Sequence, residues 1–142
     1  MDVKLKLSLV FYSMAVIVLA ILGFTYSLKP TFMPYHAEVI GMSWEQLSPE
    51  LQLLIFAFMK AFGVTMIALS ITVASLIWIP LRKGQKWAKI TIPIALFMYA
   101  IPCLWIPFFL NQQTGANTPV MVAIIGNSLT ALGLIFSLLS KD

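Results

Sequence analysis

Acidic side chains, cysteine and histidine are scarce in this chain of 142 residues. It contains five Asp and Glu in total, one Cys and one His. Thiol oxidoreduction needs a pair of cysteines, so the single Cys103 excludes that class. A structural zinc site takes several His, Cys or acidic ligands, so we expect no metal site and no cofactor. None of the acids lies inside an apolar run, which argues against proton-coupled export through a buried carboxylate.

Apolar residues dominate instead, at 61% of the chain, while charged residues make up 10%. Soluble domains usually contain about 25% charged residues. Four continuous apolar runs account for the difference, and each approaches or exceeds the ~20 residues that a helix needs to cross ~30 Å of hydrocarbon. Continuous rather than alternating runs favour helices over a β-barrel. We predict an all-α integral membrane protein, a bundle of four transmembrane helices in one domain (1–142), with spans at Leu7–Leu28, Leu51–Ile79, Ile90–Leu110 and Val120–Leu139.

The basic residues are concentrated before the first run, after the last run and in the central link, residues 80–89. This link has no acid, whereas the link at residues 29–50 has one cation against three acids. Because Lys and Arg are retained on the cytoplasmic side, we expect both termini and the central link to face the cytoplasm. Two interpretations of the central link stay open: plain orientation bias, or binding of anionic lipid headgroups. The basic residues concerned are Lys4, Lys6 and Lys141 near the termini, and Arg82, Lys83, Lys86 and Lys89 in the link. The net charge of +4 therefore does not indicate nucleic acid.

The link at residues 29–50 is too apolar for a free loop. Pro34 can open a short helix and Gly41 can close it. Ser43 with Gln46 fits a capping box, which starts a further turn. We therefore predict that this link, between the first and second spans, lies on the membrane surface or folds over the bundle as a short helical lid on the outer, periplasmic side.

Proline and its neighbours predict the ends of the spans. Ser48 and Pro49 fit an N-cap followed by the first helical residue of the second span, and Pro80 should end that span at Ile79. Thr118 and Pro119 repeat the cap-then-proline pattern before the last span. We expect Pro102 and Pro107 to kink the third span, since each removes a backbone hydrogen bond.

One group of polar and aromatic residues predicts a pocket on the outer face. Lys60 can pair with Glu38 or Glu45 if the lid folds down, and His36 would then titrate near neutral pH. The alternative is that Lys60 extends towards water and His36 caps a turn. The candidate pocket residues are Tyr35, His36, Glu38, Trp44, Glu45 and Lys60, with Tyr99 nearby.

Polar and small residues inside the spans have two further interpretations. Asn127, near mid-span, needs a hydrogen-bonding partner, which is either another helix or a ligand. Small-residue pairs permit close helix packing, so we expect a homo-oligomer or a place among other membrane subunits. These pairs are Ala57/Ala61, Ser70/Ala74 and Gly126/Gly133.

Several short motifs occur in a fixed order between Met33 and Pro119. They are M-P-Y-H at residues 33–36, Gly41, W-x-x-L at residues 44–47, Pro49, Gln52, Lys60, Gly63, IPLRKGQKWA at residues 79–88 and ANTP at residues 116–119. Together they resemble a family of small bacterial four-helix inner-membrane proteins with an M-P-Y-H…W-x-x-L outer loop. The resemblance implies a bacterial inner membrane and places the shared polar residues on the outer link, but it implies no activity.

Three functions are compatible with these features. The leading hypothesis is a non-enzymatic accessory or lipid-binding module whose partners are membrane lipids and other membrane subunits. The second is a membrane enzyme that acts on a lipid or isoprenoid at the outer leaflet, with His36 and Glu38 in acid–base roles. The third is a small-solute or ion transporter formed between protomers.

Overall fold

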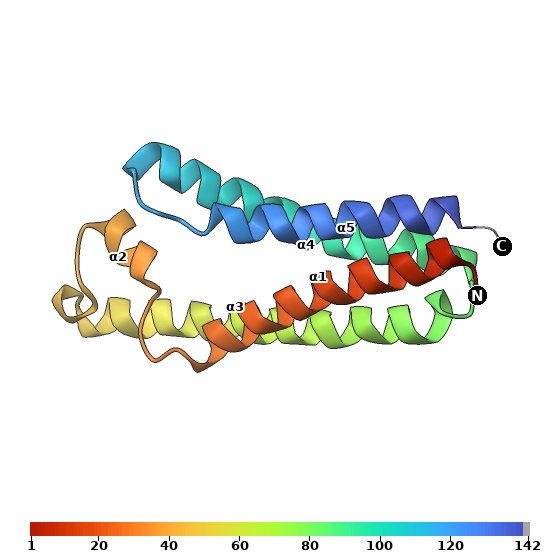
Figure 1. Cartoon of the computed structure of the whole chain (residues 1–142). Coiled ribbons are helices and arrows are strands. Elements are labelled where there is room, and N and C mark those ends of the chain that lie inside the picture. The colour runs from red at the N-terminus through yellow and green to blue at the C-terminus, as the bar shows by residue number, and fades with distance from the viewer. Residues whose placement is uncertain (141–142) are drawn as a thin grey trace.

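The computed structural model describes residues 1–140, so Lys141 lies outside the described residues. Within this range the chain is helical and contains no β-strand (Figure 1). A 3₁₀ turn, η1, and a π turn, η2, accompany five α-helices. In chain order the elements are α1 (Val3–Leu28), α2 (Pro34–Ile40), η1 (Trp44–Gln46), α3 (Pro49–Leu76), η2 (Ile77–Leu81), α4 (Lys86–Thr114) and α5 (Val120–Leu139).

Four of these helical segments are long and apolar enough to cross a membrane. They contain 26, 33, 29 and 20 residues, with α3 and η2 counted as one segment. The prediction of four candidate spans is confirmed in this sense. The first begins four residues earlier than its apolar run, at Val3, because the Asp2 side chain accepts a hydrogen bond from the Lys4 amide and caps the helix. The third extends past Leu110 to Thr114, where Gly115 adopts a left-handed φ of 71°.

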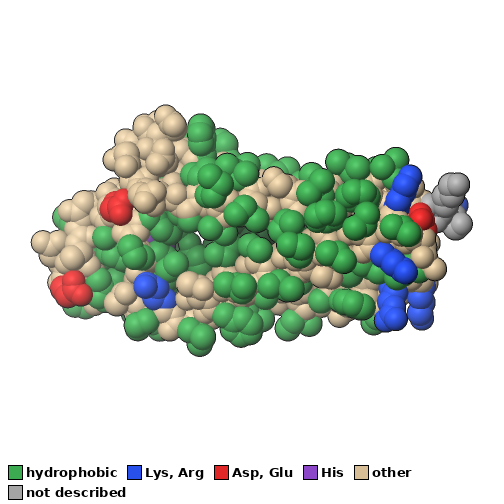
Figure 2. Space-filling view, in the orientation of Figure 1, with side chains coloured by type: hydrophobic (Ala, Val, Ile, Leu, Met, Phe, Trp, Pro, Cys, Tyr) green, Lys and Arg blue, Asp and Glu red, His purple; other side chains and the backbone are tan. Residues whose placement is uncertain are grey.

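The long helices form an elongated bundle (Figure 1). Helix α1 packs along α3 and α5, and α4 packs mainly along α5. Helices α3 and α4 are joined through η2 at the end of the bundle where the N-terminus also lies. We call this the basic end, because Lys and Arg side chains gather there in the space-filling view (Figure 2). At the opposite end, the α1–α3 pair and the α4–α5 pair diverge and α2 lies near both.

Small residues let α1 approach its neighbours closely. A Cβ atom on Gly63 of α3 would lie 2.6 Å from the Ser27 amide nitrogen and 2.8 Å from the Gly23 carbonyl oxygen of α1. On the other side of α1, a Cβ atom on Gly133 of α5 would lie 2.6 Å from the ring of Tyr12, which is fully buried. All three distances are shorter than an ordinary Cβ contact, so a side chain at Gly63 would force the backbone of α1 to shift, and one at Gly133 would force the Tyr12 ring to shift.

The three small-residue pairs differ in burial and in what they pack against. Gly133 packs inside the chain, and Ser70 is buried and donates to the Met66 carbonyl at 2.7 Å. Gly126 has no heavy atom within 4 Å of the position a Cβ would take. Ala57 and Ala61 are exposed on α3.

Two predicted helix ends are wrong. Pro80 does not stop the second span at Ile79: the helix continues as the π turn η2, in which the Arg82 amide donates to the Ile77 carbonyl at 3.1 Å. In an α-helix the ring of a proline crowds the carbonyl four residues earlier. The wider π turn leaves room for the ring of Pro80. Thr118 does not cap the last span. Pro119 occupies the N-cap position, and the Thr118 hydroxyl donates instead to the Pro107 carbonyl of α4 at 2.7 Å.

Candidate functional site

The segment between α1 and α3 is ordered by its own capping interactions. Pro34 opens α2, and Gly41 closes it with a φ of 73°. The Ser43 amide donates to the Gln46 side-chain oxygen at 2.7 Å, which confirms the predicted capping box. The Gln52 amide group then donates to the Trp44 carbonyl at 2.8 Å. These contacts fix the segment against the start of α3.

Aromatic rings connect this segment to three of the long helices. The Tyr35 hydroxyl of α2 is hydrogen-bonded to the Tyr26 hydroxyl of α1. The Tyr26 ring contacts Phe62 of α3 at 5.4 Å between centroids, and Phe62 stacks on Tyr99 of α4 at 5.9 Å. We call this set the aromatic cluster: Tyr26, Phe32, Tyr35, His36, Trp44, Phe62 and Tyr99. It brings together Tyr35, His36 and Trp44 of the predicted pocket.

His36 caps the start of α2 rather than pairing with an acid. Its Nδ1 atom accepts a hydrogen bond from the Met33 amide at 3.3 Å. The rings of Phe32 and Tyr35 pack against it, at 6.2 Å and 4.2 Å between centroids. Burial lowers the pKa of His36 below its ordinary value, so the imidazole is neutral at pH 7, as its accepting role requires. Of the two interpretations of His36, this geometry matches the capping one.

Glu38 and Glu45, the two acids of the predicted pocket, contact different parts of the chain. The Glu38 carboxylate accepts a hydrogen bond from the Asn117 amide at 2.6 Å, which ties α2 to the link between α4 and α5. Glu45 is exposed, and hydrogen bonds from its own backbone amide and from the Ser43 hydroxyl lower the pKa of its carboxyl. Glu38 thus contacts the link between α4 and α5, whereas Glu45 contacts the turn that contains it.

The Lys60 ammonium group contacts backbone carbonyls at the end of α1, which neither interpretation of this residue had named. Its ammonium group donates to the Ser27 carbonyl at 2.5 Å and the Lys29 carbonyl at 2.7 Å, and lies 4.6 Å from the centroid of the Phe56 ring. Ser27 belongs to the last turn of α1, where carbonyls have no partner in the helix and the dipole favours a cation. The end of the neighbouring helix therefore supplies the acceptors for this cation. Lys60 is thus a helix-capping residue.

The four basic residues of the central link do not all face outward. Arg82, Lys83 and Lys86 are exposed, and the Arg82 guanidinium lies 5.7 Å from the centroid of the Trp78 ring. Lys89 is only 8% exposed, and its ammonium group contacts the Ser140 carbonyl at 3.4 Å, beyond the last turn of α5. Lys89 resembles Lys60 in this respect. The exposed basic residues of this link are thus Arg82, Lys83 and Lys86.

Asn127 connects two helices. Its amide nitrogen donates to the Ala100 carbonyl of α4 and to the Ala123 carbonyl of its own helix, each at 2.9 Å. This geometry matches the interhelical interpretation of Asn127. Beside it, a small apolar hollow of about 50 Å³ separates α1, α4 and α5. Gly126 and Tyr99 lie in its wall.

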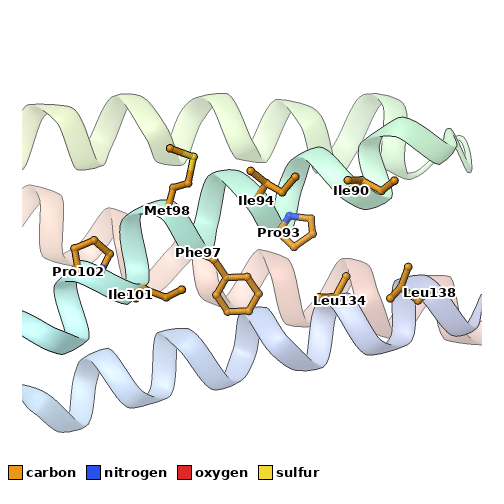
Figure 3. Close-up of a pocket in the computed structure, with 9 residues that line it drawn as sticks. All are labelled: Ile90, Pro93, Ile94, Phe97, Met98, Ile101, Pro102, Leu134 and Leu138. Atoms are coloured by element: carbon orange, nitrogen blue, oxygen red, sulfur yellow. The ribbon is translucent and has the colours of Figure 1, made fainter.

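A large apolar groove runs along α4, and the sequence did not predict it. Its volume is about 680 Å³, and no polar side chain lines it. Figure 3 shows Phe97 between α4 and α5, with Leu134 and Leu138 of α5 facing it. The signal in the sequence was the spacing of Ile90, Pro93, Phe97 and Ile101 on one helical face. The lining residues are Ile90, Pro93, Ile94, Phe97, Met98, Ile101, Pro102, Leu134 and Leu138.

The fold and these surfaces define an all-helical protein with four segments suited to a membrane, an aromatic cluster at one end and exposed basic residues at the other. Within residues 1–140 no group of three or more His, Cys, Asp or Glu side chains is placed to hold a metal ion. Comparison of the chain with protein-family models, with curated proteins and with solved structures found no match.

Proposed function

We propose that the protein is a non-enzymatic, multi-pass membrane module that binds lipid. The groove along α4 is the observation that carries this proposal. Its volume of about 680 Å³ falls within the ~300–1,000 Å³ of typical ligand sites. Its walls are wholly apolar and it opens sideways, so it suits a hydrocarbon chain that enters from the bilayer.

Proline explains why a groove forms here. Three prolines lie inside α4, and two of them, Pro93 and Pro102, line the groove. A proline removes one backbone donor from the helix and carries a compact ring instead of a long side chain. The larger Phe97, Leu134 and Leu138 then form the walls, as Figure 3 shows.

Filling the groove tests the proposal. Ile101 lines it and is 57% exposed. We expect Ile101→Trp to lower the amount of lipid that copurifies with the protein about fivefold, because the indole occupies the space of the chain. Native mass spectrometry of gently extracted protein measures both the bound lipid and the number of chains.

Ile71→Trp is the matched control for this substitution. Ile71 lies on α3, is 64% exposed and does not line the groove. We expect this variant to retain lipid like the wild type. Equal loss in both variants, or no lipid on the wild-type protein, would refute the proposal.

We further propose a bacterial inner membrane as the location, with the basic end in the cytoplasm and α2 with η1 as a periplasmic lid. The separation of charge supports this orientation, since Lys and Arg concentrate at one end of the molecule (Figure 2). The contacts of Tyr35 with Tyr26 and of Glu38 with Asn117 support the lid, because they connect α2 to both helix pairs.

Cysteine labelling tests this orientation. Met42, between α2 and η1, is 50% exposed, and Gln85, at the basic end, is also exposed. In a Cys103→Ala background, we expect Met42→Cys to react with a membrane-impermeant maleimide in intact cells. Gln85→Cys should react only after the membrane is permeabilised. The opposite pattern would show the opposite orientation. Labelling of both sites in intact cells would show that the protein does not have one fixed orientation in the membrane.

Self-association is part of the same proposal. Of the three small-residue pairs, Ala57/Ala61 is exposed on α3 and available to a second copy or another subunit. The native mass spectra of the wild type report the number of chains, and a purely monomeric species would contradict self-association.

A further inference from the structure

The groove along α4 continues towards the exposed basic residues. Lys86, Ile90, Pro93 and Phe97 follow one another at spacings of four, three and four residues, so they lie on one face of the helix. Ile90, Pro93 and Phe97 line the groove, and Lys86 is one turn beyond its end. Lys83 lies in the turn that precedes α4. An apolar groove and exposed cations therefore adjoin.

The length of the groove corresponds to one leaflet. Ile90 and Pro102 mark its two ends and are 12 residues apart, which is about 18 Å of helix at ~1.5 Å per residue. Half of a ~30 Å hydrocarbon core is about 15 Å. Exposed Trp78 and Trp87 flank the basic residues, as aromatic side chains do at the headgroup level. A chain in the groove would thus have its headgroup beside Lys83 and Lys86.

From this arrangement, which rests on the proposed lipid-binding function, we infer that the ligand is an anionic phospholipid of the leaflet at the basic end. Its acyl chain lies in the α4 groove, and its phosphate and anionic headgroup contact Lys83 and Lys86, with Arg82 adjacent. Cations near an anionic surface attract it by ~1 kcal/mol each, which corresponds to about fivefold in affinity. The apolar groove supplies affinity for any acyl chain, and the basic residues supply the selectivity for charge.

The test compares two lipids that share acyl chains and differ in charge. The wild-type protein is titrated with phosphatidylglycerol and, separately, with phosphatidylcholine, and the bound lipid is counted by native mass spectrometry. We expect the wild type to prefer phosphatidylglycerol, and Lys83→Gln with Lys86→Gln to reduce that preference about 25-fold. Binding of phosphatidylcholine should change little. Salt should weaken the preference, because exposed charges are screened.

Lys4→Gln with Lys6→Gln is the matched control, since it removes two exposed cations at the same end of the molecule, but from α1. We expect this variant to keep the preference. A loss as large as that of the Lys83/Lys86 variant would show general attraction to anionic lipid and overturn the inference.

The failure of this inference and the failure of the proposed function give different results. Equal binding of both lipids by the wild type, still reduced by Ile101→Trp, overturns only the anionic ligand. Binding of neither lipid overturns both proposals. Binding of phosphatidylglycerol that Ile101→Trp leaves undiminished would place the lipid away from the groove and also contradict the inference.

Discussion

Replacing Gly63 with alanine is expected to separate α1 from α3 and to produce one of the largest losses of stability of any single substitution in this protein. The new Cβ atom would lie 2.6 Å from the Ser27 amide nitrogen and 2.8 Å from the Gly23 carbonyl. Both neighbours are backbone atoms, so no side-chain rotation relieves the clash. Overpacking costs ~1–3 kcal/mol, and we expect the upper end of that range here. Thermal unfolding in mild detergent measures the loss.

Gly126→Ala is the control for this experiment. Gly126 also lies within a helix, but no heavy atom lies within 4 Å of the position its Cβ would take. Alanine in a helix is favoured over glycine by ~0.5–1 kcal/mol, so this variant should unfold at the same temperature as the wild type or slightly higher. A Gly63→Ala protein as stable as Gly126→Ala would show that the close α1–α3 crossing is not required.

Replacing Lys60 with methionine is expected to destabilise the same helix pair by a different route. Methionine keeps the long apolar stem but removes the ammonium group, which donates to the Ser27 and Lys29 carbonyls. Hydrogen bonds to charged groups contribute ~1.5–3 kcal/mol, and both carbonyls would lose this partner. We expect a loss of about 3 kcal/mol in the free energy of unfolding, measured in the same detergent assay.

Two variants distinguish capping from general loss of charge. Lys60→Arg keeps a cation that can donate to both carbonyls, so we expect it to recover at least half of the lost stability. Lys83→Met removes an exposed cation at the other end of the molecule, and it should change stability by less than ~0.5 kcal/mol. If Lys60→Met were as stable as Lys83→Met, Lys60 would not act as a cap for α1.

Local signals in the sequence predicted local structure well. Ser48 and Pro49 begin α3, Pro34 and Gly41 bound α2, and Ser43 with Gln46 forms a capping box. Each of these features depends on interactions within about four residues, and the sequence alone specifies such interactions. The separation of basic from acidic segments likewise appears as two differently charged ends of the bundle (Figure 2).

Partners distant in the chain could not be predicted in the same way. Lys60 had both carboxylates and backbone carbonyls within plausible reach, and the packing of α1 on α3 at Gly23 and Gly63 decides between them. The sequence offered no equivalent signal for Lys89, whose contact at Ser140 is 51 residues away. The sequence did not predict the groove either, since its shape depends on how α4 and α5 pack and not on any polar motif.

The contacts of Lys60 have a consequence for how the chain is made. Ribosomes synthesise the end of α1 before Lys60, which is 31 residues beyond Lys29 and 33 beyond Ser27. The carbonyls at the end of α1 are thus synthesised before the ammonium group that eventually donates to them. If the chain crosses a bilayer as proposed, water or headgroups would solvate these carbonyls until α3 packs against α1.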